Sequence, residues 1–455
     1  MTSTAGDVLS PLEMRNLTIK NRVMRSSISG RFDNEDGTPT QTRLNWETMC
    51  AEGGVGTIIT SYVPVLMSGR IIAGYATIHD DRLIDPWSKI VQAVHNHGAK
   101  IIMQLSHSGR QMDVPGLQNL HLSTLSSTDK SESLHGFPTR AMTLGEIHHM
   151  IDAFARAAGR AKKAGLDGVE LHASNGYLFS QFLSSGINDR RDRYGGELFN
   201  RARFLLDVIH AIRAEVGTKY HLQVKLSAID LNNVLPNEGA GNTLDETIQV
   251  ARWVETAGAD ALHVSMGSLF PHPLNPVGAF SFNTVASTYD GMLASGENTF
   301  RNYLFFRYAP LRPLFGYLWN RMKHGRPVEG VSADEAFAIK RAVSIPVFST
   351  GGWQTRSVID GHLGQGHFDG VTIARALIAN PDLVRHWEAG LERPPVPCTH
   401  CNKCLLNAPR NPLGCYEPDR FDGNPEQMIE AIMRIYRVKP ELTVPPVARV
   451  NHERA

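Results

Sequence analysis

The sequence predicts an α/β fold, a (β/α)8 TIM barrel, and the first observation behind this prediction is a repeat along the chain. Four segments share a glycine-containing turn that leads into a short apolar run, at residues 52–60, 164–172, 257–265 and 366–374. Each has the form of a helix end followed by a buried strand. The second observation is that amphipathic helical segments alternate with strand candidates, which favours a closed parallel barrel.

Taken in chain order, eight strand candidates complete the barrel. They are residues 21–27, 52–60, 100–105, 164–172, 221–227, 257–265, 345–350 and 366–374. Three helix starts carry the signature of a capping box or cap. These are Thr143 with Glu146, Thr243 with Glu246, and Ser332 with Glu335. An open doubly wound sheet is the structural alternative, but no glycine fingerprint for a dinucleotide follows the first strand.

Two regions fall outside the repeat. We expect the barrel to occupy residues 1–395, with a long insertion at 268–330, and a cysteine-containing extension to occupy 396–455 with one helix at 425–437. The insertion holds 12 of the chain's 35 aromatic residues, interleaved with arginines. A loop of that length is typical of a lid or of a subunit contact in a homo-oligomer. Contact with a membrane surface through 299–326 is the alternative, although two prolines interrupt any continuous interfacial helix there.

Charge and composition exclude several classes of partner. Lys plus Arg number 46 and Asp plus Glu 45, so the net charge of +1 gives no global attraction for nucleic acid. The sequence contains no uninterrupted apolar run long enough to predict a transmembrane segment. The N-terminus has no signal-peptide pattern, so we expect a cytoplasmic protein. Four of five cysteines crowd into 398–415, which is not a secreted disulfide framework.

Polar residues follow the predicted strands at the ends where the active sites of such barrels lie. In strand order they are Ser27 and Ser29; Thr60 and Ser61; Gln104 and His107; His172, Asn175 and Tyr177; Lys225 and Ser227; His263 and Ser265; Gly351 and Gly352; and Ala374 and Arg375. The glycine pair with Arg375 has the form of a phosphate site, because glycine lets backbone N–H groups approach an anion closely. A turn next to a surface arginine is the plainer interpretation.

Several segments, in order, resemble the signatures of the Old Yellow Enzyme family of FMN-dependent NAD(P)H:flavin oxidoreductases. They are LSPLEMRNLTIKNRV, IIMQLSHSGRQ, GVELHASNGYLFSQFLSSGINDRRDRYGG, NRARF and ARALIANPDL. The resemblance runs from about Leu9 to about Pro395, interrupted by the insertion. The segment GVELHASNGYLFSQF is the most specific of these, and the glycine pair alone would carry little weight.

The resemblance implies a site for FMN and for NAD(P)H as co-substrate. In it, the phosphate binds at Gly351, Gly352, Ala374 and Arg375, Gln104 contacts the flavin ring, and Ser27, Ile28 and Ser29 lie beneath it. His172 and Asn175 match the pair that binds the carbonyl oxygen of an unsaturated small-molecule substrate, and Tyr177 matches the proton donor. This implies an ene-reductase that transfers hydride from flavin N5 in ping-pong fashion.

Three positions depart from the family pattern. Ser29 stands where many relatives have Thr or Cys, Tyr62 replaces a usually small residue, and Lys225 takes the place of an arginine beside the flavin. Lysine can still offset negative charge on the reduced ring, but it lacks the bidentate fork of arginine. Besides the ene-reductase, a dehydrogenase that passes electrons through an iron–sulfur cluster to a partner and a non-catalytic flavin-binding barrel remain as alternative functions.

The cysteine segment, CTHCNKCLLNAPRNPLGC, has the spacing C-x2-C-x2-C-x10-C and contains Cys398, Cys401, Cys404 and Cys415. Three closely spaced thiolates and a fourth suit a [4Fe-4S] cluster better than zinc, which favours two separated pairs. The segment also resembles the cluster region of the dienoyl-CoA reductase and trimethylamine dehydrogenase branch. Only 40 residues follow Cys415, too few for that branch's further nucleotide-binding domains. Zinc and reduced thiols without a metal remain alternatives.

Overall fold

Eight parallel strands close into one barrel in a computed structural model that describes residues 6–112, 123–133, 136–232, 239–267, 271–289, 297–323 and 325–437. In chain order the barrel strands are β3 (Val23–Arg25), β4 (Thr57–Ile59), β6 (Lys100–Ser106), β9 (Gly168–Ala173), β10 (His221–Ser227), β11 (Ala261–Ser265), β12 (Val347–Thr350) and β13 (Gly370–Ile373). Each pairs with the next, and β13 pairs with β3 to close the ring. Every one of the eight predicted segments supplies one barrel strand, so the predicted TIM barrel is confirmed.

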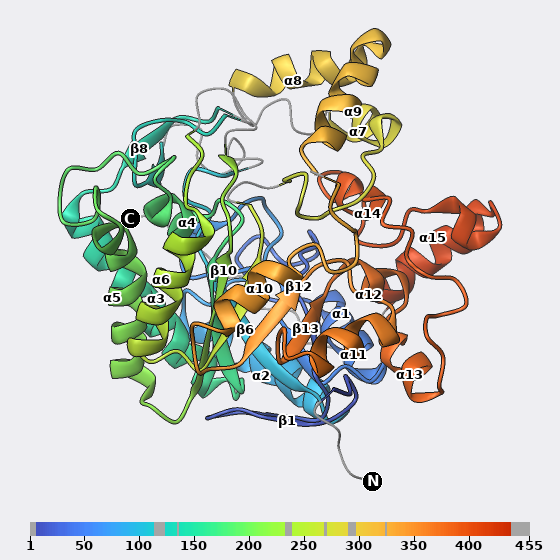
Figure 1. Cartoon of the computed structure of the whole chain (residues 1–455), viewed down its shortest axis with the longest axis horizontal. Coiled ribbons are helices and arrows are strands. Elements are labelled where there is room, and N and C mark those ends of the chain that lie inside the picture. The colour runs from blue at the N-terminus through green and yellow to red at the C-terminus, as the bar shows by residue number, and fades with distance from the viewer. Residues whose placement is uncertain are drawn as a thin grey trace, which may run out of the picture.

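Helices surround the barrel between successive strands (Figure 1). The outer ring consists of α1 (Gln41–Glu52), α2 (Ile84–His95), α3 (Leu144–Lys163), α5 (Leu198–Val216), α6 (Leu244–Thr256), α10 (Ala333–Lys340), α11 (Arg356–Gly364) and α13 (Leu383–Glu388). Two short helices, α4 (Leu178–Leu183) and α12 (Arg375–Ala379), follow β9 and β13 at the end where the strands terminate. The apolar faces of the outer helices and the outward side chains of the strands form one continuous core.

Two of the three predicted caps are confirmed. Thr143 with Glu146 and Thr243 with Glu246 form complete capping boxes at the starts of α3 and α6. The prediction for Ser332 is wrong: its side chain makes no cap to α10, and its hydroxyl donates instead to the carbonyl oxygen of Thr350 at the end of β12. A Ser/Thr hydroxyl can satisfy either partner, and here the neighbouring strand end lies closer.

Small elements cover the two ends of the barrel. At the N-terminal end, the hairpin β1 (Leu12–Glu13) and β2 (Thr18–Ile19) closes a plug of buried side chains that includes Met24, Ile102 and Phe348. At the opposite end lie β5 (Val63–Pro64), β7 (Thr124–Ser126), β8 (Thr139–Ala141) and the short helices η1 (Met67–Gly69) and η2 (Asp81–Leu83). The barrel is therefore sealed at one end and built up with loops at the other.

The insertion and the extension pack against each other at the loop end. The insertion contains α7 (Phe282–Thr288), α8 (Glu297–Arg307), η5 (Ala309–Leu311) and α9 (Arg312–Arg321), so prolines do break it into short helices as expected. The extension contains α14 (Lys403–Asn407), η6 (Pro418–Phe421), α15 (Pro425–Met433) and η7 (Arg434–Tyr436). The helix predicted at 425–437 thus ends at Met433 and tightens into a 3-10 turn. Residues 268–270, 290–296 and 438–455 of the predicted insertion and extension lie outside the described residues.

Within the described chain, no helix combines the length and the apolar character that a membrane crossing requires.

Candidate active site

One large cavity lies at the C-terminal ends of the barrel strands and gathers most of the residues predicted for the site. The predicted residues that line it are Ser27, Ile28, Ser29, Tyr62, Gln104, His172, Asn175, Tyr177, Lys225, Ala374 and Arg375. Gly351 and Gly352 line a second cavity that shares Thr350, Ala374 and Arg375 with the first. The two cavities therefore meet end to end along the top of β12 and β13.

His172, Asn175 and Tyr177 come together in one wall of the larger cavity. His172 is on β9, Asn175 follows in the turn, and Tyr177 caps the start of α4. The ring centroids of His172 and Tyr177 lie 4.8 Å apart at an interplanar angle of 70°. Burial lowers the pKa of His172 well below its usual value, with the nearby Lys225 acting in the same direction. His172 is therefore a neutral imidazole with one N–H to donate.

The side-chain amide of Asn175 is buried and aimed by its neighbours. Its Oδ1 accepts a hydrogen bond of 2.8 Å from the hydroxyl of Ser174, whereas its Nδ2 has no hydrogen-bond partner among the described residues. A buried donor without a partner is costly. In a cavity wall, such a donor indicates the position of an acceptor on a bound molecule.

Behind the cavity, Gln104 belongs to a buried polar network. Its Nε2 donates to the carboxylate of Glu170 at 2.6 Å, and the same carboxylate contacts Nδ1 of His263 at 2.8 Å. His263 in turn reaches the hydroxyl of Thr372 at 2.9 Å. Glu170 thus fixes the orientation of the Gln104 amide, whose oxygen has no partner in the described part of the chain.

Lys225 interacts electrostatically with Glu170. It lies on β10 and is buried, and desolvation lowers the pKa of its ammonium group to about 8, with Glu170 opposing the shift. A negatively charged ligand in the cavity would favour the protonated form. The predicted role of Lys225, to offset negative charge in the cavity, is therefore compatible with its position.

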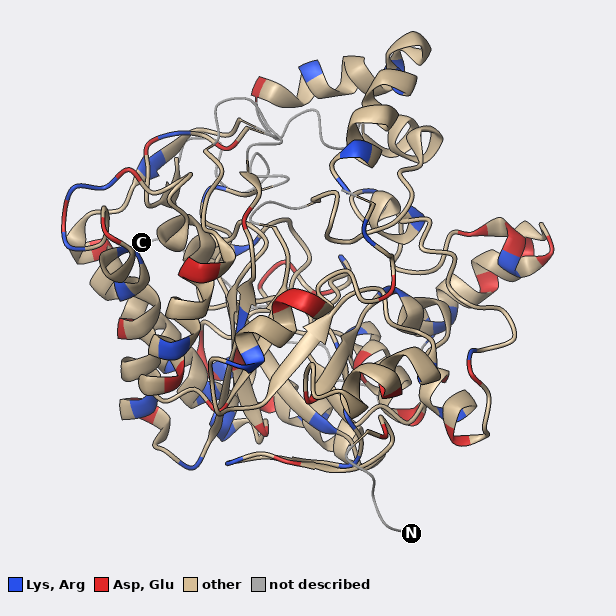
Figure 2. Cartoon of the chain, viewed as in Figure 1, with Lys and Arg blue, Asp and Glu red and all other residues tan. Residues whose placement is uncertain are grey.

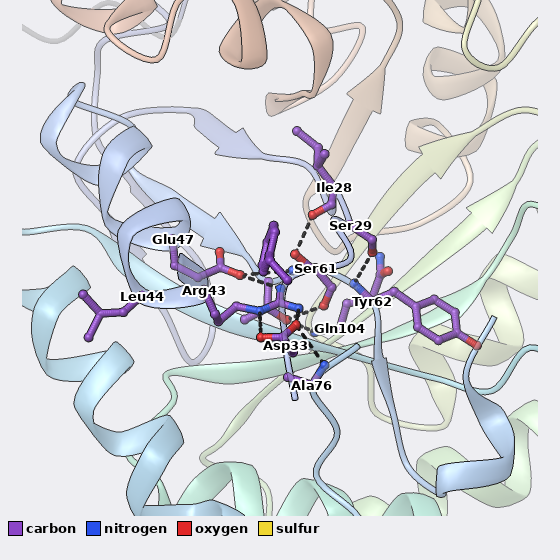
Figure 3. A network of polar contacts seen from close by, with 12 residues as sticks. Ile28, Ser29, Asp33, Arg43, Leu44, Glu47, Ser61, Tyr62, Ala76 and Gln104 are labelled. Carbon is purple, nitrogen blue, oxygen red and sulfur yellow. Dashed lines mark hydrogen bonds and ion pairs between the residues drawn. The ribbon is translucent and has the colours of Figure 1, made fainter. Parts of the chain in front are cut away.

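A buried network of charged side chains supports the loops that carry Ser29 and Tyr62 (Figure 3). Arg43 lies between Asp33 and Glu47, and the N–H of Ala76 donates to Asp33 at 2.9 Å. Above this network, the backbone N–H of Tyr62 donates to the hydroxyl of Ser29 at 3.2 Å. Breaking such a buried pair by removing one partner costs about 3 to 5 kcal/mol. The ion pairs therefore stabilise the structure behind the cavity wall that Ser29 and Tyr62 form.

The second cavity is built from the glycine pair and its surroundings. Gly352 has a φ of +68°, and a Cβ placed on it would lie 2.3 Å from the carbonyl oxygen of Val328. Only glycine fits this backbone. Arg375 reaches the same cavity, and its Nη1 donates to Oδ1 of Asn402 at 2.6 Å. His400, from the extension, closes the cavity and contacts the carbonyl oxygen of Gly352 at 2.9 Å.

The four cysteines predicted as metal ligands line a third cavity together. It is lined by Cys398, Cys401, Cys404 and Cys415, and by Arg375, which also lines the second cavity. Burial raises the pKa of the Cys404 thiol to about 12. Among the described residues, no group of three or more His, Cys, Asp or Glu side chains is arranged to hold a metal ion. The cysteines therefore converge without forming a preassembled single-ion site.

Several lining residues were not predicted from the sequence. Ile71, Ile72 and Tyr75 come from the loop after β5, and Leu405 and Leu413 come from the extension. They do not follow a predicted strand end, so the rule that found the other residues could not reach them. Conversely, His107 and Ser227 follow strand ends but do not line the cavity; His107 lies against Gly69 and Ser68 instead.

Residues 7–297 match the model of the NADH:flavin oxidoreductase / NADH oxidase family. The chain belongs to this family. The family's proteins are oxidoreductases, and membership implies FMN and NAD(P)H as cofactor and co-substrate. Over 390 residues the chain is 32% identical to the NADH oxidase of Thermoanaerobacter brockii. The aligned region covers 85% of this chain and 51% of that protein. The chain thus spans about half the length of this relative.

Solved structures support the same fold for this member of the NADH:flavin oxidoreductase family. A complex of 2-naphthoyl-CoA reductase with 2-naphthoyl-CoA superposes with a TM-score of 0.74 at 24% identity, covering 94% of this chain and 58% of that one. The Old Yellow Enzyme homologue from Zymomonas mobilis gives a TM-score of 0.63 at 22% identity, covering 85% and 94%. At these sequence identities the structural similarity supports the barrel fold. The chemistry must be inferred from the residues of the site.

Proposed function

We propose that the protein is an FMN-dependent NAD(P)H oxidoreductase that reduces the activated C=C bond of an α,β-unsaturated carbonyl compound. The unpartnered Nδ2 of Asn175, buried in the cavity wall beside His172 and Tyr177, is the observation that carries this proposal. Two fixed N–H donors at one point of a cavity would bind a carbonyl oxygen and stabilise negative charge on it better than water does.

The residues around the two joined cavities fit FMN. The free Oε1 of Gln104 offers an acceptor to a ring N–H of the flavin. Lys225 would offer a positive charge to the flavin ring, and the Gly351–Gly352 backbone with Arg375 would hold the phosphate in the second cavity. An elongated cofactor with an anionic end matches two cavities that meet at Ala374 and Arg375.

In the proposed reaction, FMN would, when bound, supply the hydride that it takes from NAD(P)H. His172 and Asn175 hold the carbonyl oxygen of the substrate, so that hydride arriving at the β-carbon drives the electron pair of the C=C bond toward that oxygen. Tyr177 then donates the phenolic proton to the α-carbon as general acid. The products are a saturated carbonyl compound and NAD(P)⁺, and Tyr177 regains its proton from solvent.

Both substrates would use the same face of the cavity. The sequence shows no separate dinucleotide fingerprint after the first strand, and one cavity contains all three residues of the proposed donor set. NAD(P)H would therefore leave before the unsaturated substrate enters, which gives ping-pong kinetics.

The substrate class includes both unsaturated ketones and unsaturated thioesters. The carbonyl oxygen that His172 and Asn175 would bind is common to the two. The structural neighbour named above as a 2-naphthoyl-CoA reductase makes a CoA thioester a reasonable second member of a substrate panel beside a simple cyclic enone.

The Tyr177→Phe variant tests the proposed proton donor. With the flavin-loaded protein, stopped-flow absorbance should show reduction by NAD(P)H largely unchanged and reoxidation by an enone slowed by about a hundredfold or more, since general acid catalysis contributes that much. Tyr75→Phe is the matched control, because Tyr75 lines the same cavity outside the donor set.

Two results would contradict the proposal. If Tyr177→Phe slows both half-reactions equally, Tyr177 is not the proton donor. If the purified protein binds no flavin, the reductase assignment itself is wrong and a non-catalytic barrel becomes the better interpretation.

A second candidate adds an iron–sulfur cluster to the same protein. It is favoured by the convergence of the four cysteines on the third cavity. Two residues that line this cavity, Cys404 and Arg375, also line the large cavity. Cubane clusters are bound by four cysteine thiolates, and the guanidinium of Arg375 would offset part of their charge. Such a cluster would let electrons pass between the flavin and a partner.

Anaerobic purification distinguishes the two candidates. Broad visible absorption beyond the flavin bands, lost in Cys404→Ser and retained in Cys50→Ser, would support the cluster. Cys50 is a buried thiol far from the segment in sequence, so it controls for the loss of a cysteine as such. A spectrum of flavin alone in the anaerobic wild type would contradict the cluster and leave the first candidate standing.

A further inference from the structure

The α8–η5–α9 hairpin, residues 297–321, exposes an unusual amount of apolar surface. Seven of the 14 large hydrophobic side chains that are exposed in the described chain belong to it. They are Phe300, Phe305, Tyr308, Leu311, Leu314, Tyr317 and Leu318. Exposed apolar residues scattered singly are ordinary, whereas a cluster of this kind marks a contact surface.

The other face of the hairpin is well anchored. Phe306 and Phe315 pack with ring centroids 5.4 Å apart, and Phe280 packs on Trp319 at 4.8 Å. At the base, the hydroxyl of Thr288 donates to the carbonyl oxygen of Leu406 at 2.7 Å, which ties α7 to α14. This inner core holds the helices in place. The exposure of the outer apolar side chains is therefore not a result of loose packing.

The charge of the hairpin is predominantly positive: residues 297–321 contain four arginines, Arg301, Arg307, Arg312 and Arg321, and one carboxylate, Glu297. From residue 298 to residue 328 the sequence contains six Lys and Arg residues and no Asp or Glu. Arg301, Arg307 and Arg321 are exposed, and none of them takes part in an ion pair between described residues. The chain as a whole carries a net charge of only +1. The hairpin is therefore a local cationic and apolar surface on a nearly neutral protein, and Figure 2 shows the ribbon of its basic residues in blue in the upper part of the molecule.

We propose that the α8–η5–α9 hairpin docks the protein on the surface of an anionic lipid bilayer. Aromatic and leucine side chains that enter the headgroup region, flanked by arginines that contact lipid phosphates, are the features of interfacial membrane binding. Each basic side chain near an anionic surface contributes attraction, and that attraction is screened by salt.

The shape and charge of the hairpin favour a bilayer over the other possible occupants. The hairpin projects from the barrel as a convex edge (Figure 1), which suits a soft, deformable surface. A two-fold contact with a second copy would place the same patch on both sides, and so would bring the four arginines of each hairpin together with only Glu297, at the start of α8, to pair with them. A lid is not favoured either, because from the described part of the insertion only Asn275 and Pro276 line the large cavity.

Docking would also orient the molecule. The insertion follows β11 and therefore rises from the end of the barrel where the candidate active site opens. A protein held by the hairpin would turn this end toward the lipid. The docking proposal rests on the surface of the hairpin and does not depend on the reaction proposed above.

Vesicle sedimentation with the full-length protein tests the proposal. We expect the protein to sediment with vesicles that contain phosphatidylglycerol, less with pure phosphatidylcholine, and less as salt is raised. The double variant Leu314→Ser/Tyr317→Ser should lose binding. The double variant Arg301→Gln/Arg307→Gln should weaken it by about fivefold per arginine. Both should keep the wild-type rate of flavin reduction by NAD(P)H, because none of the four residues lines the cavity.

Two matched variants lie on α15 and at the start of the adjoining η7. Ile429 and Arg434 are an exposed apolar and an exposed basic residue away from the hairpin, so Ile429→Ser and Arg434→Gln should bind vesicles as the wild type does. The proposal is overturned if the wild type does not bind anionic vesicles, or if the hairpin variants bind as well as these controls. It is also overturned if the apolar variant converts a dimer into a monomer in lipid-free sedimentation velocity, since the patch would then be a subunit interface.

Discussion

Asn175 performs two tasks at the scale of the single residue. It has a φ of 62°, in the left-handed region that asparagine tolerates better than most residues, and Gly176 continues the turn at a φ of 83°. The same turn places Asn175, with its unpartnered Nδ2, in the wall of the cavity. Asn175–Gly176 is thus both a turn and the support of a donor, which a sequence pattern alone could not separate.

Asn175→Asp separates these tasks. Aspartate also tolerates the left-handed conformation, so the fold and flavin binding should persist, while the N–H donor becomes an anionic acceptor. We expect kcat/KM for an enone to fall by about a hundredfold to a thousandfold, the usual effect of losing an oxyanion donor. Steady-state kinetics measure this. Activity within a few fold of the wild type would show that the donor does not contact the substrate.

Gly352 is fixed by both backbone conformation and space. Gly352→Ala places a Cβ 2.3 Å from a carbonyl oxygen at a φ of +68°, whereas Gly366→Ala places one at a φ of +71° with nothing within 4 Å. Both variants incur the left-handed cost of about 1 to 2 kcal/mol. Only Gly352→Ala adds overpacking, about 1 to 3 kcal/mol more.

We therefore expect chemical denaturation to show a larger loss of stability for Gly352→Ala, together with weaker FMN binding in a fluorescence titration. Gly366→Ala should leave the affinity for FMN unchanged. Equal effects of the two variants on FMN binding would show that the glycine pair does not form the phosphate cradle.

At the scale of elements, the capping box of α3 gives a pH-dependent contribution to stability. Arg140, followed by the contacts to Thr143, lowers the pKa of Glu146 to about 2. A carboxyl group whose folded-state pKa is depressed stabilises the fold above its unfolded pKa, and this contribution is lost as the pH falls toward the folded-state value.

Glu146→Gln should therefore lower the free energy of unfolding at pH 7, and the difference from the wild type should shrink as the pH falls from about 4.5 toward 2. Urea denaturation at several pH values measures it. Asp245→Asn in the first turn of α6 is a control, because Asp245 is not the box residue there. A difference that does not change with pH would contradict the assignment.

The elements of the barrel were predictable because each has a local signal. The glycine turns, the alternation of apolar runs with amphipathic helices, and the two Thr-x-x-Glu boxes all depend on residues close in sequence. Ser332 shows the limit of prediction from local signals. Its hydroxyl donates to the carbonyl oxygen of Thr350, which is distant in sequence, and does not cap the helix. Similarly, strand-end residues could be placed at one end of the barrel, but Ile71 and Tyr75 reach the cavity through a loop without a periodic pattern.

At the scale of the whole molecule, the extension completes the site that the barrel begins. Asn402 accepts from Arg375, and its Nδ2 donates to the carbonyl oxygens of Pro276 and Ala279 at 3.1 and 3.0 Å. Gln354 of the barrel exchanges two hydrogen bonds with the backbone of Cys398. Asn402 therefore connects the insertion, the extension and the end of β13 at the proposed phosphate cradle.

Asn402→Ala should weaken FMN binding although Asn402 lies outside the barrel strands. It removes a hydrogen bond to a charged group, worth about 1.5 to 3 kcal/mol, and releases Arg375 from its position over the cradle. We expect the Kd for FMN to rise by about tenfold or more in a fluorescence titration. Asn411→Ala is the matched control, because the hydrogen bonds that Asn411 makes to described residues go to Asn407, within the extension. If Asn402→Ala binds FMN as tightly as Asn411→Ala, the barrel holds the phosphate alone and the extension serves the cysteine cavity only.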